Sequence, residues 1–252
     1  MRYRTHVAAA GTVLLAAAVL PQLPLSAIAL AGSASPAEHG AATQPSGRGA
    51  AGPASAREGS VAAADLLARV KDCARISKGL YRTDDNGAAT VPVCGAKGAV
   101  FWQADMDIDC DGQVTAHCNS ATDRWFQNST AFSQSDGKPL NSEKLPYVVV
   151  PAPGGTWDYT ASGINGGGVA AVIHDGRVQY AVVGDTGPAG IIGEASYATA
   201  AAMGIPSHPE RGGVPSGVTY ILFRDSRVSP IEDHAAAVRL GDQLAKKFLR
   251  DN

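Results

Sequence analysis

Two carboxylic acids in an apolar, glycine-rich segment are the residues of this chain best suited to chemistry. Asp185 and Glu194 lie nine positions apart, and no other charged residue occurs between Gln179 and Tyr197. Such a segment is expected to be buried or to line a cleft, where an unpaired carboxylate is costly. Two carboxyls in unequal surroundings can differ in pKa, so that one acts as an acid and the other as a base. In a purely structural alternative, Asp185 orders a turn and Glu194 caps the following helix.

A second group of acids occupies residues 105–112, which read DMDIDCDG. Its carboxylates alternate along the chain: Asp105, Asp107, Asp109 and Asp111. On an extended strand they share one face and repel each other, which favours a cationic partner, either calcium or a polycationic substrate. The match to an EF-hand loop is incomplete, because Cys118 stands where the bidentate glutamate belongs and no helix pair flanks the loop. A solvated acidic edge that prevents strand pairing is a third interpretation.

Other catalytic motifs are weaker. Asp185-Thr186-Gly187 matches the short aspartic-protease signature, but the chain has no second D-T-G or D-S-G, and Pro188 replaces the usual Ser or Thr. Neither a G-x-S-x-G motif nor a phosphate-binding loop is present. We expect no metal and no cofactor. Four histidines also show no metal-ligand spacing: His117, His174, His208 and His234.

The N-terminus has the features of a secretion signal. Arg2 and Arg4 precede an apolar stretch, and Ala29-Leu30-Ala31 forms an A-x-A cleavage site. The alternative, a membrane anchor, is disfavoured by two prolines inside the stretch. We expect residues 1–31 to be a cleaved signal peptide and the protein to be secreted.

The folded part is expected to be one domain, residues 61–252. The preceding residues 32–60 lack any large apolar side chain and predict a flexible linker or propeptide. Removing residues 1–31 takes away two arginines and no acid, so the formal net charge changes from −2 to −4. No basic face is implied, which argues against a nucleic-acid partner.

Four cysteines lie in the first third of this domain. In an exported protein an even number favours two disulfides, and three pairings are possible. We prefer Cys73 with Cys94 and Cys110 with Cys118. A zinc site is disfavoured, because no C-x-x-C pair is present and only His117 lies nearby.

The pattern of the domain is mainly β. The dipeptide Asp175-Gly176 predicts a tight hairpin turn. Strands with few, peripheral helices indicate a mainly β fold (α+β), a small barrel or sandwich with helices packed outside. Strands are predicted at 99–103, 147–150, 169–174, 178–184 and 218–224, and helices at 61–71, 194–203 and 231–249.

Together these segments resemble the secreted chitosanases of glycoside hydrolase family 75. The resemblance runs from about Leu80 to Phe223 and implies endo-hydrolysis of β-1,4-linked glucosamine polymers with inversion. It also implies that Asp185 and Glu194 are the essential pair. The segments that carry it are YRT at 81–83, FWQADMDIDCDG at 101–112, YVVVP at 147–151, and GDTGP with the later GE at 184–194.

A weaker similarity concerns the fold. The Asp-Thr-Gly…Ile…Gly…acid pattern resembles a block in the double-psi β-barrel domain of membrane-bound lytic transglycosylases, where the later acid is the proton donor. In this chain the second acid is Glu, it comes two residues earlier, and Gly190 is additional. The similarity implies a six-stranded double-psi-like β-barrel and a proton-donor role for Glu194.

These resemblances lead to a set of assigned roles. Glu194 is the acid and Asp185 the base, with their oxygens about 6.5–9.5 Å apart, although the reverse assignment stays open. The partner is chitosan, whose ammonium groups would attract carboxylates. We expect a monomer that is not membrane-attached after signal cleavage. The residues assigned to chitosan binding are Asp105, Asp107, Asp109, Asp111 and Trp102.

Three further aromatics could stack on sugar rings or belong to the core: Trp125, Trp157 and Tyr159. Two other functions also stay open. One is a non-hydrolytic carbohydrate-binding or wall-loosening barrel, and the other is a peptidoglycan-cleaving enzyme.

Overall fold

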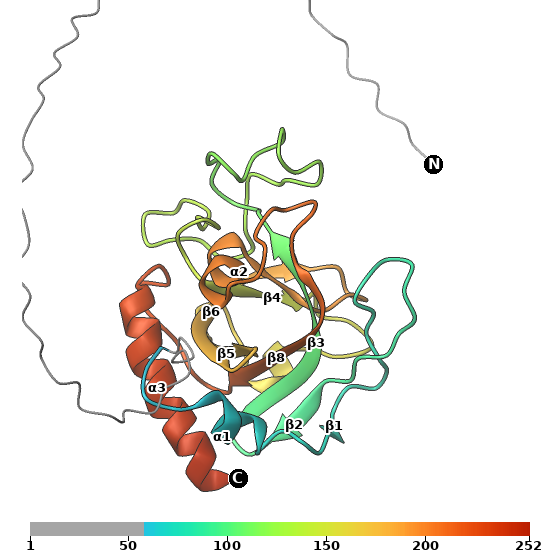
Figure 1. Cartoon of the computed structure of the whole chain (residues 1–252), viewed down its shortest axis with the longest axis vertical. Helices are drawn as coiled ribbons and strands as arrows, with labels where there is room; N and C mark the ends of the chain where they lie inside the picture. The colour runs from blue at the N-terminus through green and yellow to red at the C-terminus, as the bar shows by residue number, and fades with distance from the viewer. Residues whose placement is uncertain (1–57) are drawn as a thin grey trace, which may run out of the picture. The chain divides into compact units, whose positions relative to one another are not determined.

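The computed structural model describes residues 58–252, which form a ring of strands with helices on its outside (Figure 1). The predicted signal peptide and most of the predicted linker lie outside the described residues. Glu58, from the end of that linker, belongs to the fold: its carboxylate accepts a hydrogen bond from Tyr180 N at 2.9 Å and pairs with His234 at 2.7 Å. Within residues 58–252, no helix is long and apolar enough to cross a membrane.

Six strands close into a barrel, which confirms the predicted mainly β fold. The ring closes because its last strand pairs with its first, so the barrel itself has no unpaired edge. In ring order the strands are β3 (Ala99–Asp109), β7 (Glu194–Ser196), β4 (Tyr147–Pro151), β6 (Arg177–Gly187), β5 (Val169–His174) and β8 (Val214–Phe223). The pairs β3–β7 and β4–β6 are parallel, and the other neighbouring pairs in the ring are antiparallel.

All five predicted strands are present. β3 extends beyond the predicted segment to Asp109, so the first three acids of the alternating group lie on this strand. Two short strands, β1 (Ala74–Arg75) and β2 (Cys94–Ala96), extend the sheet outward from β3. The predicted hairpin joins β5 to β6, with φ of 45° at Asp175 and 73° at Gly176.

The core has two parts, separated by the wall of the barrel. On β3, the alternate residues from Val100 to Ile108 belong to the inner cluster, whereas Ala99 and Phe101 belong to an outer cluster with residues of α1 (Ala63–Leu67) and α3 (His234–Asp251). The side chains of β3 that point out of the barrel are therefore those at odd-numbered positions, including its acids.

The helices differ from their predicted bounds for local reasons. α1 is shorter than the predicted 61–71, because Arg69 N and Val70 N bond to the carbonyls three residues before them and tighten the last turn. α3 begins after Asp233, whose side chain accepts a hydrogen bond from Ala236 N at 2.8 Å.

The predicted helix 194–203 is wrong at its beginning. Residues 194–196 form strand β7, and the helix α2 is Tyr197–Met203. Ser196 caps it by accepting from Thr199 N at 3.2 Å. Glu194 therefore does not cap a helix, because its backbone is used in the parallel pairing with β3.

The two disulfides join Cys73 to Cys94 and Cys110 to Cys118, the pairing preferred from the sequence. The first ties the segment after α1 to β2. The second closes a turn directly after β3 and braces the long loop 110–146, which leads to β4.

Candidate active site

Asp185 reaches the outer face of the barrel because β6 contains one extra residue. Val183 pairs with Val148 of β4, but Asp185 pairs with the next residue, Val149, so Gly184 is a β-bulge. The bulge reverses the alternation of side chains, and Asp185 points out of the barrel with Val149. Only glycine fits at the bulge, since a Cβ at Gly184 would lie 2.6 Å from the Cβ of Tyr147.

The Asp185 carboxyl is buried and held by two backbone donors. Its side chain is 6% exposed, and its Oδ1 accepts hydrogen bonds from Ala131 N and Thr186 N, both at 2.7 Å. Burial raises the pKa of Asp185, whereas the two hydrogen bonds lower it and favour the charged form. Ala131 belongs to the loop 110–146, which therefore helps to orient this carboxylate.

Glu194 lies on the same outer face, on β7. It pairs with Asp107 of β3, and its Oε2 would be 2.5 Å from a Cβ at Gly187, so its carboxyl lies against the end of β6. Burial raises the pKa of Glu194 to about 7, with further contributions from Asp107, Asp111 and Asp185. A carboxyl with this pKa retains its proton in a large fraction of molecules near neutral pH, as a general acid requires.

Three carboxyls come together where the end of β3 lies near the end of β6. Oxygens of Asp109, Asp111 and Asp185 lie within 4.8 Å of one another. Asp111 N donates to Asp109 Oδ1 at 2.7 Å, and Gln127 N donates to Asp111 Oδ1 at 2.6 Å. Burial and neighbouring acids raise the pKa of Asp109 well above its usual value, and burial raises that of Asp111 to about 6.

This three-carboxyl cluster carries no counter-charge of its own. Within residues 58–252, none of its acids is ion-paired with a lysine or arginine. Carboxylate oxygens suit a hard cation such as calcium, which would need further oxygens from the backbone or water to reach its six to eight ligands. Asp109 ends β3, Asp111 follows it and Asp185 is on β6, so the three acids do not form an EF-hand loop. An ammonium group is an equally suitable partner for this charge.

The remaining acids of β3 continue the line away from this cluster. Asp107 is exposed, and Asp105 is buried with its Oδ1 lacking a hydrogen-bond partner. The Asp105 carboxyl occupies the space that a side chain at Gly193 would need. Burial, and to a lesser extent Asp107, raises the pKa of Asp105 to about 8.

Two acids of the site are absent from the predicted set. Burial and the charge of Asp84 raise the pKa of Asp107, and Asp85 contributes to that of Glu194, so both acids lie near enough to act on the site. Their turn is held beside β7 by Arg82, which donates from its N to Gly190 O and accepts from Ile192 N, both at 3.0 Å. The only sequence signal is that these acids directly follow the YRT segment.

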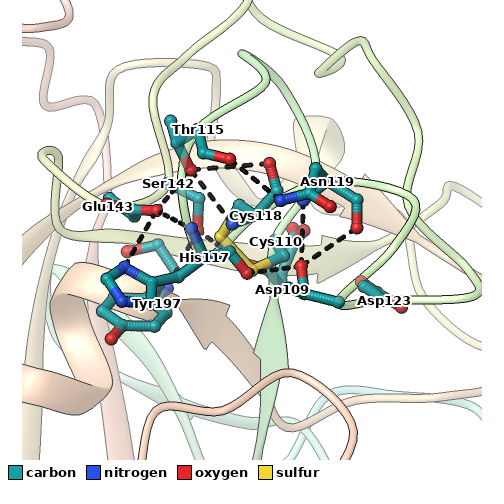
Figure 2. The surroundings of a disulfide bond; sticks show 12 residues. Asp109, Cys110, Thr115, His117, Cys118, Asn119, Asp123, Ser142, Glu143 and Tyr197 are labelled. Carbon is teal, nitrogen blue, oxygen red and sulfur yellow. Dashed lines mark hydrogen bonds and ion pairs between the residues drawn. A yellow bond between two sulfur atoms is a disulfide. The ribbon is translucent and has the colours of Figure 1, made fainter. Parts of the chain in front are cut away.

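The loop that carries Asp111 is braced around the second disulfide (Figure 2). Glu143 accepts hydrogen bonds from Thr115 and from His117 N, and the His117 ring stacks on Tyr197 with centroids 5.4 Å apart. Ser142 Oγ donates to the carbonyl of Asp109 at 2.5 Å. These contacts fix the point where the chain leaves β3 and so hold Asp109 and Asp111 in place.

The prediction that Trp102 binds substrate is wrong. Trp102 is 1% exposed inside the barrel, where it stacks on Tyr220 and meets Trp157 edge to face. Trp102 is at an even-numbered position of β3 and the acids are at odd-numbered ones, so its side chain points to the inside of the barrel. Trp157 and Tyr159 are also buried, whereas Trp125 is 75% exposed.

Comparison with known proteins finds relatives of one kind. A family model described as fungal chitosanase of glycosyl hydrolase group 75 matches residues 106–248. The endo-chitosanase of Aspergillus fumigatus is 30% identical over 196 residues, which cover 70% of this chain and 79% of that protein. Endo-chitosanase C of Aspergillus oryzae is 30% identical over 142 residues, so the match spans 54% of this chain but about a third (34%) of that protein. With more than half of its length matched by the family model, this chain belongs to glycosyl hydrolase family 75.

Proposed function

We propose that the protein is a secreted endo-chitosanase that hydrolyses β-1,4-glucosaminidic bonds with inversion. The observation that carries the proposal is the pair Asp185 and Glu194, which share the outer face of the barrel in unequal surroundings. The names of the Aspergillus relatives supply the substrate class. The two disulfides are compatible with an exported protein.

Glu194 is proposed as the general acid. Within the described residues its carboxyl has no hydrogen-bond donor, and its raised pKa of about 7 follows from burial and neighbouring acids. It would give its proton to the glycosidic oxygen as the bond from that oxygen to C1 breaks. The charge that Glu194 then carries would be opposed by Asp107 and Asp111, which makes the proton easier to recover for the next cycle.

Asp185 is proposed as the general base. Its two backbone hydrogen bonds favour the carboxylate, which would take a proton from water while the water oxygen bonds to C1. Attack from the face opposite to the leaving oxygen converts the β-linkage to an α-anomer at the new reducing end. No further group is needed to balance this step, since the water supplies both the hydroxyl on C1 and the proton that returns to the carboxyl pair.

The line of acids on β3 is proposed to bind the polymer. Chitosan carries an ammonium on most of its sugars, and these acids, which have no lysine or arginine partner among residues 58–252, would attract it. Asp84 and Asp85 add to this charge from the turn that follows Arg82. Burial is the main cause of the raised pKa of Glu194, and the same acids add to it, so they would serve both substrate attraction and the acid function.

The test is product analysis on soluble chitosan with Asp185→Asn and Glu194→Gln beside the wild type. Each change should lower kcat by about 100-fold to 10,000-fold, the range typical of a lost acid or base. Asp65→Asn is the matched control, because Asp65 is an exposed acid on α1, outside the site. Proton NMR of early products should show the α-anomer.

Other outcomes of these assays would indicate a different function. Binding without new reducing ends would indicate a carbohydrate-binding barrel, and anhydro products from peptidoglycan would indicate a lytic transglycosylase. Retained activity in Asp185→Asn or Glu194→Gln would remove that residue from the catalytic pair.

A further inference from the structure

The chain has three tryptophans, and only one of them reaches solvent. Trp102 and Trp157 are 1% and 6% exposed, whereas Trp125 is 75% exposed. A tryptophan left in water forgoes a large gain in burial free energy, and the same amphipathic ring is well suited to contact a ligand. Neither the catalytic pair nor the core makes use of this side chain.

Trp125 is held in place rather than left on a loose loop. Its N donates to Asp123 Oδ1 at 2.8 Å, and its carbonyl accepts from the Gln127 side chain at 3.4 Å. The Arg124 guanidinium lies 5.7 Å from the centre of the indole ring, and Arg124 is itself bound to Glu210 through its backbone N and its Nε. The guanidinium covers one face of the ring, which leaves the other face to solvent.

The position of Trp125 extends the line of acids. Gln127 N donates to Asp111 Oδ1 at 2.6 Å, and an Asp111 carboxyl oxygen lies within 4.8 Å of one from Asp185. Two residues of extended chain span at most about 7 Å, so the backbone of Trp125 lies close to the three-carboxyl cluster that contains Asp111. A single oligosaccharide bound across the catalytic pair could therefore reach the indole ring.

We propose that Trp125 is the stacking platform of a distal subsite, where it binds the apolar face of a glucosamine ring of the same polymer. The inference rests on the proposed function, because that function supplies the ligand. The equatorial ammonium of a stacked sugar would lie at the edge of the sugar ring, and the nearby Asp111 would attract it. The counter-charge of Glu210 on Arg124 limits repulsion between that guanidinium and the ligand. The platform should therefore add affinity for longer chains without taking part in the chemistry.

The exposure pattern of the tryptophans provides a direct test. In Glu194→Gln, which is expected to bind without hydrolysis, fluorescence that acrylamide can quench comes mainly from Trp125. Saturating β-1,4-glucosamine hexamer should shield this signal, and Trp125→Phe in the same background should remove it. Trp125→Ala should weaken hexamer binding about tenfold in calorimetry, whereas Trp125→Phe should stay within about threefold.

Val114→Ala is the matched control, since Val114 is 69% exposed on the same loop and has no assigned role. Its hexamer affinity should equal that of the parent. Three results would contradict the stacking role of Trp125. They are hexamer binding that leaves acrylamide quenching unchanged, a hexamer affinity of Trp125→Ala equal to that of the parent, and no hexamer binding at all. Hydrolysis by the wild type is measured separately: if it fails while hexamer still shields Trp125, the proposed activity is wrong and the platform stands.

Discussion

Glu194 of β7 lies directly beside Asp107 of β3, because the two parallel strands pair these residues in register. Asp107 N also donates to the carbonyl of Gly193 at 2.8 Å, which fixes the register of the two strands. The proposed catalytic acid is thereby placed next to Asp107, whose charge adds to the effect of burial in raising its pKa. This one pairing connects the barrel topology to the chemistry of the site.

Asp107→Asn should shift the alkaline limb of the pH–rate profile to lower pH. As the proposed general acid, Glu194 would act in its protonated form, so activity should decline as the pH rises through its pKa of about 7. Removing the negative charge of Asp107 lowers that pKa, and the decline then begins at a lower pH. The measurement is kcat on soluble chitosan from pH 4 to 9, with Asp65→Asn as the control. If the alkaline limb stayed at the same pH, it would not report the titration of Glu194, and the acid role of Glu194 would be contradicted.

The stability of the fold should decrease from mildly acidic pH toward pH 8. Asp105 has a pKa of about 8 in the fold, against about 4 in the unfolded chain, so the folded state binds more protons between these values. The free energy of unfolding therefore falls as the pH rises through this window. Asp105→Asn removes this term, and its Tm should exceed that of the wild type at pH 8 by more than at pH 4. Parallel curves of Tm against pH for the two proteins would contradict the burial of a protonated Asp105.

Gly184→Ala should impair both stability and catalysis. The added Cβ would lie 2.6 Å from the Cβ of Tyr147, and such overpacking typically costs about 1–3 kcal/mol. Because relief of the clash moves the bulge that aims Asp185, kcat should fall more than KM rises. Gly190→Ala is the matched control, since a Cβ there meets nothing within 4 Å. Urea unfolding measures the effect on stability and steady-state kinetics the effect on catalysis. Equal behaviour of the two variants would mean that the bulge at Gly184 does not position Asp185.

Asp107→Asn combined with Asp109→Asn should weaken the capture of a polycation. The double change removes the carboxylate of Asp107 and also that of Asp109, whose raised pKa an approaching ammonium would lower so that it ionises. KM for chitosan should therefore rise several-fold, and it should depend less on salt, because less electrostatic attraction is left for salt to screen. Steady-state kinetics between about 0.02 and 0.5 M NaCl give both quantities. Asp65→Asn with Asp72→Asn removes the same charge from exposed positions elsewhere, and an equal change in that variant would indicate an effect of net charge alone.

Much of the fold follows from local pattern. The five apolar runs are strands, Asp175-Gly176 is the hairpin turn, and the nearest-neighbour cysteines are bonded. Alternation along 105–109 was enough to place those acids on one face, because a strand repeats every two residues. Two acids isolated in an apolar segment were likewise recognisable from composition.

Long-range pairing decided the rest. Glu194 is in a strand because β3 binds its backbone, although an alanine-rich sequence follows it, and Asp185 faces outward because β4 forces Gly184 into a bulge. Trp102 points inward because barrel closure makes the opposite face of β3 the interior. Asp84 and Asp85 come near the site because Arg82 bonds to the segment before β7. Local propensity and periodicity are properties of neighbouring residues, whereas the face that is buried and the groups that meet depend on which distant strands pair.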